Sequence, residues 1–381
     1  MPFSQIFHQL HRNETSTSLL RRFEQLIEPK SDAALEAMAR EADRITRRNF
    51  GKTMRMFAPL YVSNECVNNC KYCGFSRDNP ILRVTLSIGQ LRREAEHLAA
   101  QGFRNILLVA GEHPKFVSEG YLEECIHEIR SFIPTVALEV GPMETPEYAK
   151  MVKAGSEGLV VYQETYDPET YRELHTAGPK KNFDWRLDCP ERAYDGGYRR
   201  IGIGALFGLA DWRTEARGLA AHLEHLNRHC WKASFTISFP RMRPAAGEFE
   251  PKFSLPDREF VQLITAFRIT FPEVGIVLST REPAALRDAI LPLGITSMSA
   301  GSHTEPGGYT GEGQDDLHLT VKGRRVELEA STPCETKKAT EQFGIADVRS
   351  PADITAMLQR KGFDPVWKDW DEAILNPTTA P

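Results

Sequence analysis

Short apolar runs rich in β-branched residues recur along the chain, and most are followed by a polar loop and a segment with helical spacing. The eight runs cover residues 57–62, 105–110, 136–140, 158–162, 201–206, 233–238, 276–279 and 295–299. The helical segments between them cover residues 86–101, 119–132, 146–154, 169–176, 212–228, 257–271 and 283–291. Strands that are apolar throughout and alternate with helices are typical of parallel β-structure buried on both faces.

The number of these units distinguishes between parallel folds. Eight units over roughly 250 residues match an α/β fold of the (β/α)8 TIM-barrel type. A doubly wound sheet is the alternative, but it usually carries a glycine fingerprint after its first strand. Here the first run is followed by cysteines. We therefore predict a barrel over residues 51–301.

The barrel is predicted to carry an extension at each end. Residues 1–50 form an N-terminal helical extension, with helices at 16–27 and 32–47. Residues 302–381 form a C-terminal loop and helical extension that covers the barrel, with a helix at 353–361. The glycine-rich residues 301–313 suit a loop over the barrel mouth, and Trp367 and Trp370 suit anchors on apolar surface. The pattern gives no account of the charged residues 312–336.

A barrel of this type places its active site at the C-terminal ends of the strands, where polar and glycine residues gather in this sequence. Ser279 and Arg281 end the seventh run on one face of the strand, which suits bidentate binding of an α-amino acid carboxylate. Glu164 ends the fourth run and could hold a ribose hydroxyl or an ammonium group. Arg186 precedes the fifth run and could bind a carboxylate. A surface ion pair is the alternative for Glu164 and Arg186.

Composition excludes several classes of protein. The chain has 381 residues, of which 41% are hydrophobic and 26% charged, and its formal net charge is −5. These values suit a soluble globular protein and give no indication of a nucleic-acid or membrane-surface partner. No apolar run is long enough to span a bilayer, and the N-terminus lacks the pattern of a secretory signal. We expect a cytoplasmic protein.

Three of the seven cysteines, Cys66, Cys70 and Cys73, fall on one short loop directly after the first run. Thiolates bind soft metals such as zinc, copper(I) and the iron of iron–sulfur clusters. A closed zinc site needs four ligands, usually in two pairs, whereas three cysteines on a four-iron cluster leave one iron open for a further ligand. A zinc or disulfide knot completed by a distant residue is the alternative. The four solitary cysteines suit small buried hydrophobes, and they are Cys125, Cys189, Cys230 and Cys334.

The C-x3-C-x2-C spacing, with Tyr72 just before the last cysteine, resembles the signature of the radical S-adenosylmethionine (SAM) enzymes. The resemblance implies a [4Fe–4S] cluster on the three cysteines, with SAM chelated to the open iron and Tyr72 near its adenine. Gly111 and Glu112 after the second run resemble the glycine–acid element that binds the amino group of SAM in this superfamily.

Further motifs resemble one family of radical SAM enzymes, the tyrosine lyases of thiamine biosynthesis. These motifs are Val-Tyr-Gln-Glu-Thr-Tyr (161–166), Gly-Ile-Gly-Ala-Leu-Phe-Gly-Leu (202–209), Ser-Phe-Pro-Arg (238–241), Leu-Ser-Thr-Arg-Glu (278–282), Glu-Pro-Gly-Gly-Tyr (305–309) and Pro-Val-Trp-Lys-Asp-Trp-Asp (365–371). The related hydrogenase-maturation lyases carry a second cluster on C-terminal cysteines. Cys334 is the only cysteine beyond residue 230 here, so that second cluster cannot form in the same way.

The resemblance implies a reaction and its partners. Reduction of the cluster cleaves SAM to methionine and a 5′-deoxyadenosyl radical, which takes hydrogen from the amino group of L-tyrosine. The Cα–Cβ bond then breaks to give 2-iminoacetate and p-cresol, with Ser279 and Arg281 holding the substrate carboxylate. A flavodoxin or ferredoxin type electron donor and a thiazole synthase subunit are the implied partners. A sibling lyase for another aromatic amino acid and a non-enzymatic iron–sulfur or zinc protein are the alternatives.

Overall fold

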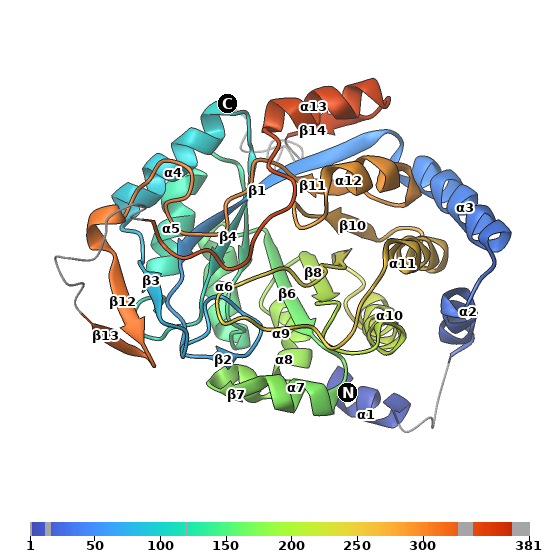
Figure 1. Ribbon diagram of the computed structural model, residues 1–381, viewed down its shortest axis with the longest axis horizontal. Helices are drawn as coiled ribbons and strands as arrows, with labels where there is room; N and C mark the ends of the chain where they lie inside the picture. The colour runs from blue at the N-terminus through green and yellow to red at the C-terminus, as the bar shows by residue number, and fades with distance from the viewer. Residues whose placement is uncertain (1, 12–16, 119, 327–337, 368–381) are drawn as a thin grey trace.

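Eight parallel strands close into a barrel in the computed structural model, which describes residues 2–11, 17–118, 120–326 and 338–367 (Figure 1). Each barrel strand pairs with the next in chain order, and the last pairs with the first through Arg55–Phe57 and Ser297–Ser299. The strands are β1 (Thr53–Ser63), β4 (Asn105–Ala110), β5 (Thr135–Glu139), β6 (Gly158–Glu164), β8 (Arg200–Ala205), β9 (Ser234–Ser238), β10 (Gly275–Leu278) and β11 (Ser297–Ser299). This closure confirms the predicted barrel and excludes the open doubly wound sheet.

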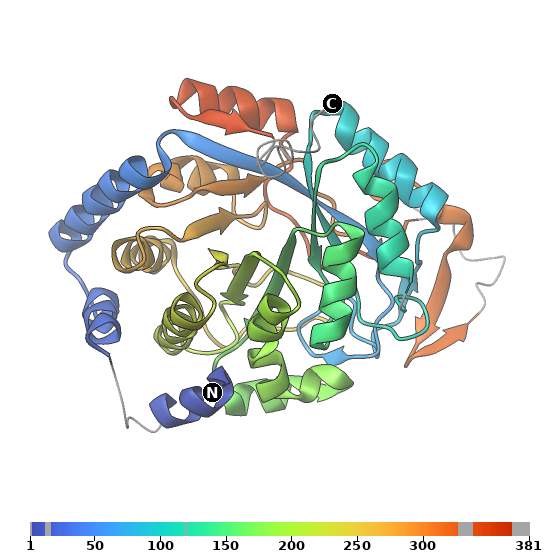
Figure 2. The same ribbon diagram turned by 180° about the vertical axis from the view of Figure 1, so that it is seen from behind.

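Helices surround the barrel, as Figures 1 and 2 show from opposite sides. The expected ones are α4 (Ile88–Ala100), α5 (Tyr121–Arg130), α6 (Thr145–Ala154), α7 (Pro168–Leu174), α10 (Trp212–His229), α11 (Asp257–Thr270) and α12 (Ala284–Ile290). Their bounds lie within a few residues of the predictions, although the expected start of one at residue 119 lies outside the described residues. Two short helices before β8 were not expected, and they are α8 (Phe183–Leu187) and α9 (Cys189–Asp195).

Three helices precede the barrel. The predicted pair is present as α2 (Ser18–Ile27) and α3 (Asp32–Phe50), which pack against α10 and α11 on the outside of the barrel. Residue 16, where the first was expected to begin, is not described. A further helix, α1 (Phe3–His11), was not expected, and its Phe3 ring stacks on His222 of α10 at 4.4 Å.

The C-terminal part returns to the barrel at two places. β14 (Asp364–Val366) pairs with the start of β1, after α13 (Pro351–Arg360). A hairpin of β12 (His318–Val321) and β13 (Arg324–Val326) adds two strands to β3 (Ile81–Arg83), which follows the cysteine loop. This hairpin accounts for part of the charged segment. Residues 327–336 of that segment, with Cys334, and the tail with Trp370 lie outside the described residues.

Trp367 packs edge-on against Phe103 at 5.0 Å, which agrees with its predicted role as an anchor. Short 3-10 turns complete the fold at η1 (Pro179–Lys181), η2 (Leu291–Leu293) and η3 (Gln314–Asp316). Within the described ranges, every helix is too short or too polar to cross a bilayer.

Candidate active site

The cysteine loop leaves the C-terminal end of β1 and is fixed at both ends by one buried arginine. Arg83 donates to the main-chain oxygens of Asn64, Phe75 and Ser76. In the middle of the loop, β2 (Asn69–Cys70) pairs with β7 (His175–Ala177), which follows α7. The loop is therefore held in one shape by contacts that do not involve its thiols.

Cys66, Cys70 and Cys73 line one cavity at the barrel mouth. In the described part of the chain, no three His, Cys, Asp or Glu side chains lie close enough together to hold a single metal ion. A four-iron cluster is larger than one ion and takes each cysteine at a separate iron, so three separated thiols on one cavity fit it. Burial raises the pKa of the Cys70 and Cys73 thiols, so cluster binding must displace their protons.

Gly111 and Glu112 line the same cavity, directly after β4. A Cβ atom on Gly111 would lie 2.2 Å from the main-chain oxygen of Glu65, so only glycine fits this close to the cysteine loop. The Glu112 carboxylate accepts from Asn68 Nδ2 at 2.6 Å, and its main-chain oxygen accepts from Val67 at 2.8 Å. The expected glycine–acid pair is thus bonded to the loop that carries the cysteines.

Glu164 and Arg186 also reach this cavity, together with Lys180 from η1. The Glu164 carboxylate lies 2.6 Å from Lys180 Nζ and 3.4 Å from Arg186 Nη2. Burial disfavours the charged carboxylate, but Lys180 and Arg186 outweigh that effect and hold the pKa of Glu164 below its usual value. Arg186 Nε donates to the main-chain oxygen of Tyr162. Glu164, Arg186 and Lys180 form a largely buried cluster of three charges, not the surface ion pair that was the alternative.

Tyr72 lies beside this cavity and does not line it. Its side chain is buried, and its hydroxyl is 2.8 Å from His175 Nε2. The Tyr72 ring also lies under the Lys180 ammonium, at 5.8 Å from the ring centre.

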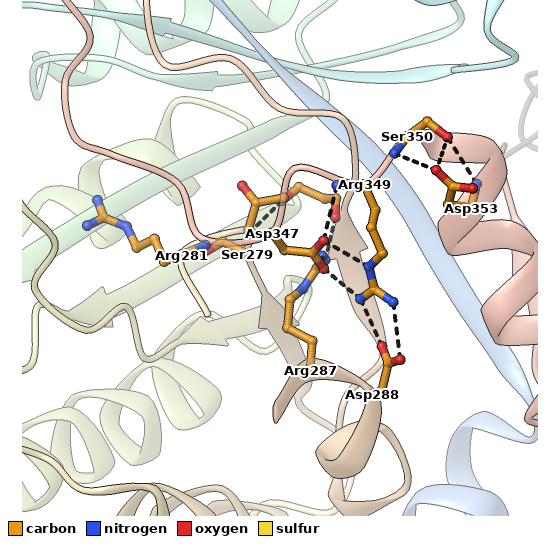
Figure 3. A network of polar contacts seen from close by, with 10 residues as sticks. Ser279, Arg281, Arg287, Asp288, Asp347, Arg349, Ser350 and Asp353 are labelled. Atoms are coloured by element: carbon orange, nitrogen blue, oxygen red, sulfur yellow. Dashed lines mark hydrogen bonds and ion pairs between the residues drawn. The ribbon is translucent and has the colours of Figure 1, made fainter. Parts of the chain in front are cut away.

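Ser279 and Arg281, which lie in the loop after β10, line a second cavity. The Arg281 main-chain nitrogen donates to Ser279 Oγ, and the Arg281 guanidinium points away from the polar network at the base of its loop (Figure 3). Burial lowers the pKa of Arg281. The remaining walls are largely apolar and aromatic, and they include Phe57, Leu107, Phe239 and Phe260.

The two cavities adjoin each other. Val109, Glu139 and Tyr162, at the ends of β4, β5 and β6, line both of them. Burial raises the pKa of Glu139 to about 7; Glu164 adds to this shift, and Arg281 opposes it. Glu139 is the last residue of β5 and lies near the end of the expected run 136–140, where a barrel active site is expected, but it was not among the predicted site residues.

The C-terminal extension completes both cavities through two neighbouring residues. Gln342 lines the cysteine cavity, and Phe343 lines the other. The Gln342 side chain accepts from the Tyr61 hydroxyl at 2.8 Å and lies 3.9 Å from Cys73 Sγ. A Cβ on Gly74 would lie 2.5 Å from the main-chain oxygen of Gln342, so the extension packs directly on the cysteine loop. No local pattern predicted Lys180, Gln342 or Phe343.

All ten residues expected at the site therefore lie at one end of the barrel. Seven of them line the first cavity, Ser279 and Arg281 line the second, and Tyr72 packs beside the first.

Comparison with known proteins agrees with this arrangement. Residues 60–216 match the radical SAM superfamily, and residues 238–364 match the Biotin and Thiamin Synthesis associated domain. The chain is 40% identical over 347 residues to the 2-iminoacetate synthase of Escherichia coli (strain K12), covering 91% of this chain and 86% of the relative. It is 39% identical, with the same coverage, to the 2-iminoacetate synthase of Salmonella typhimurium (strain LT2).

Among solved structures, the FeFe-hydrogenase maturase HydG from Carboxydothermus hydrogenoformans is similar, with a TM-score of 0.81 and 36% identity. The match covers 96% of this chain and 79% of that one. Radical SAM enzymes use a [4Fe–4S] cluster and SAM, and the three cysteines and the cavity they share suit both. The chain therefore belongs to the radical SAM superfamily of enzymes and, within it, to the family of the 2-iminoacetate synthases.

Proposed function

We propose that this enzyme cleaves the Cα–Cβ bond of L-tyrosine to 2-iminoacetate and p-cresol, for the thiazole moiety of thiamine. One observation carries the proposal: a cavity lined by three cysteines adjoins a second cavity that contains Ser279 and Arg281. A bound [4Fe–4S] cluster and SAM would supply reductive cleavage of SAM, which yields methionine and, with a hydrogen atom from the substrate amino group, 5′-deoxyadenosine.

The residues of the first cavity hold the cofactors in this proposal. Cys66, Cys70 and Cys73 bind the cluster. The Glu112 carboxylate pairs with the ammonium group of SAM, since its main chain and side chain are both fixed to the cysteine loop. Glu164 and Arg186 provide a hydroxyl acceptor and a carboxylate ligand, and Lys180 keeps Glu164 charged. Tyr72, which packs beside this cavity, lies near the adenine in this proposal.

The residues of the second cavity orient the amino acid. Arg281 and Ser279 bind the tyrosine carboxylate, and the aromatic walls surround the side chain of the substrate. Because these walls are apolar, they also keep water from the reacting carbon atoms. A thiazole synthase subunit that receives 2-iminoacetate, and a flavodoxin or ferredoxin that reduces the cluster, are the proposed partners of a cytoplasmic enzyme.

The test is an anaerobic assay of the reconstituted enzyme with SAM, dithionite and L-tyrosine, following 5′-deoxyadenosine and p-cresol together. The proposal expects both products. If tyrosine gave 5′-deoxyadenosine without p-cresol, and another aromatic amino acid were cleaved, that amino acid would replace tyrosine as the substrate. Failure to cleave SAM at all would contradict the proposal.

The Arg281→Ala variant tests the carboxylate site. Loss of a charged hydrogen-bonding partner should lower kcat/KM for tyrosine by about 10- to 100-fold, while SAM cleavage uncoupled from p-cresol formation continues. The exposed Arg48→Ala is the matched control, since it lies at the end of α3. Unchanged lyase activity in Arg281→Ala would refute this assignment.

A further inference from the structure

We propose that Glu139 binds the α-amino group of the substrate and accepts a proton from it before the Cα–Cβ bond breaks. This inference rests on the proposed function, because it requires an α-amino acid in the cavity of Arg281. Glu139 is not one of the residues that the sequence motifs mark.

The position of Glu139 is the first argument. It is the last residue of β5, opposite Val109 of β4, and it lines both cavities. The substrate amino group must lie where the two cavities meet, because the hydrogen atom it loses goes to a group formed from SAM. Glu139 and Tyr162 are the polar side chains shared by both cavities.

The unused hydrogen-bonding capacity of the Glu139 carboxylate is the second argument. The side chain is half-buried, yet within the described ranges its carboxylate accepts no hydrogen bond. A carboxylate in such a place is normally paired, because leaving it unpaired costs free energy. Substrate ammonium would satisfy it.

Charge complementarity is the third argument. Glu139 interacts electrostatically with titratable groups from several elements. They are Tyr61 of β1, Tyr162 and Glu164 of β6, Arg281 after β10, and Lys180 and Arg186 before β8. Lys180 and Arg186 are already engaged with Glu164, and Arg281 is assigned to the substrate carboxylate. Arg281 and Glu139 then match the two charges of one amino acid in a single cavity.

The proton transfer follows from chemistry and agrees with the titration of Glu139. An ammonium nitrogen has no lone pair to stabilise the loss of a hydrogen atom, so the amine must be neutral first. The N–H bond breaks, its electron pair stays on nitrogen, and the proton goes to a carboxylate oxygen of Glu139; nothing is oxidised or reduced. Because burial raises the pKa of Glu139 to about 7, this carboxylate is a stronger base than an exposed one.

The experiment compares two ligands on the reconstituted protein with SAM and no reductant, so that no turnover occurs. L-tyrosine and 3-(4-hydroxyphenyl)propanoate differ only in the amino group. By isothermal titration calorimetry, the parent enzyme should bind tyrosine about 10- to 100-fold more tightly than the propanoate. Glu139→Gln should bind both within about threefold of each other, whereas Glu273→Gln, an exposed control at the other end of the barrel, keeps the preference.

A second measurement needs no variant. In the parent enzyme, the preference for tyrosine over the propanoate should fall as pH drops through about 7, where Glu139 takes up a proton. The acidic limb of the pH profile of kcat/KM should lie there too, and Glu139→Gln should lack it.

The two hypotheses fail differently. If Glu139→Gln keeps the full preference for tyrosine, or the preference of the parent enzyme does not change with pH, Glu139 is not the amino-group ligand. If neither compound binds the parent enzyme and no p-cresol forms under reducing conditions, the proposed function is wrong instead.

Discussion

The guanidinium carbon of Arg281 lies 3.3 Å from the centre of the Phe343 ring. Arg281 comes from the loop after β10, and Phe343 comes from the segment that precedes α13. A ring face this close fixes the plane of the guanidinium and attracts its charge. The C-terminal extension therefore helps to aim the side chain that is proposed to bind the substrate carboxylate.

Removing this ring should loosen substrate binding. For Phe343→Leu we expect KM for tyrosine to rise by about 5- to 30-fold, since a desolvated cation–π contact is worth roughly 1–2 kcal/mol. The share of SAM cleaved without p-cresol should rise as well. Steady-state assays of both products test this, with the exposed Phe253→Leu as control. An unchanged KM would show that Arg281 needs no support from the ring.

Replacement of the loop cysteines should abolish cluster binding. Cys66→Ser, Cys70→Ser or Cys73→Ser should each reduce bound iron and the charge-transfer absorbance of the reconstituted protein to near background, because hydroxyls are poor ligands for this iron. Cys125→Ser, in a buried position on α5, should keep full iron loading. Iron retained by all three single variants would contradict a cluster on this loop.

The base of the Arg281 loop is held by the buried ion-pair network of Figure 3. Asp347 pairs with buried Arg287 and with Arg349. Arg349 also donates two hydrogen bonds to the Asp288 carboxylate. Asp347→Asn should lower the free energy of unfolding by about 3–5 kcal/mol, because it leaves the Arg287 charge buried and unpaired. Asp288→Asn is a partly exposed control that should cost less than about 1 kcal/mol. Urea denaturation measures both.

At acidic pH, the difference in the free energy of unfolding between Asp347→Asn and the parent enzyme should disappear. Burial works against the charged carboxylate, but Arg349 and Arg287 outweigh it and hold the pKa of Asp347 below its usual 3.8. The stabilisation is therefore fully present above pH 3.8 and is lost as pH falls through the lower folded value. Urea midpoints of the two proteins should converge only in that acidic range. Convergence already near pH 6 would assign the effect to another group.

A second buried carboxylate, that of Glu215, should make the stability of the protein depend on pH in the opposite direction. Glu215 of α10 accepts from the Tyr166 main chain at 2.6 Å and from the Thr165 hydroxyl, and burial raises its pKa from 4.5 to about 8. The folded protein then binds a proton that the unfolded chain has lost, so stability falls as pH rises from 4.5 to 8. Glu215→Gln should remove most of that slope in melting temperature between pH 6 and pH 8 relative to the parent. Equal slopes would contradict this.

The barrel could be predicted because its strands are buried on both faces and read as unbroken apolar runs. β4 begins and ends where the pattern placed it, at Asn105 and Ala110. β1 begins four residues earlier than residue 57, because its first part alternates buried positions with partly or fully exposed ones beside β14. The β12–β13 hairpin had a usable signal in Lys322 and Gly323, which both have positive φ as a tight hairpin turn requires. The many charges around it concealed that signal.

Most of the predicted site residues could be found because their chemistry coincides with a strand end. The cysteines, Glu164 and Arg281 meet that condition. Lys180 lies in a 3-10 turn, where a lysine normally faces solvent, and only its contact with Glu164 in the folded chain marks it. Gln342 is 269 residues from Cys73, and Phe343 follows it, so their places depend on tertiary packing that no local pattern encodes.

The distance along the chain between Cys73 and Gln342 also sets an order of events during translation. The glutamine that lies across Cys73 is the 269th residue that a ribosome adds after it. The last barrel strand, β11, and β14 are made late as well, so β1 lacks these two partners while the cysteine loop is still uncovered on that side. Gln342, which lies across Cys73 and whose main chain packs on Gly74, is added only after this interval. A chain that stopped before residue 338 would keep the loop without its cover permanently.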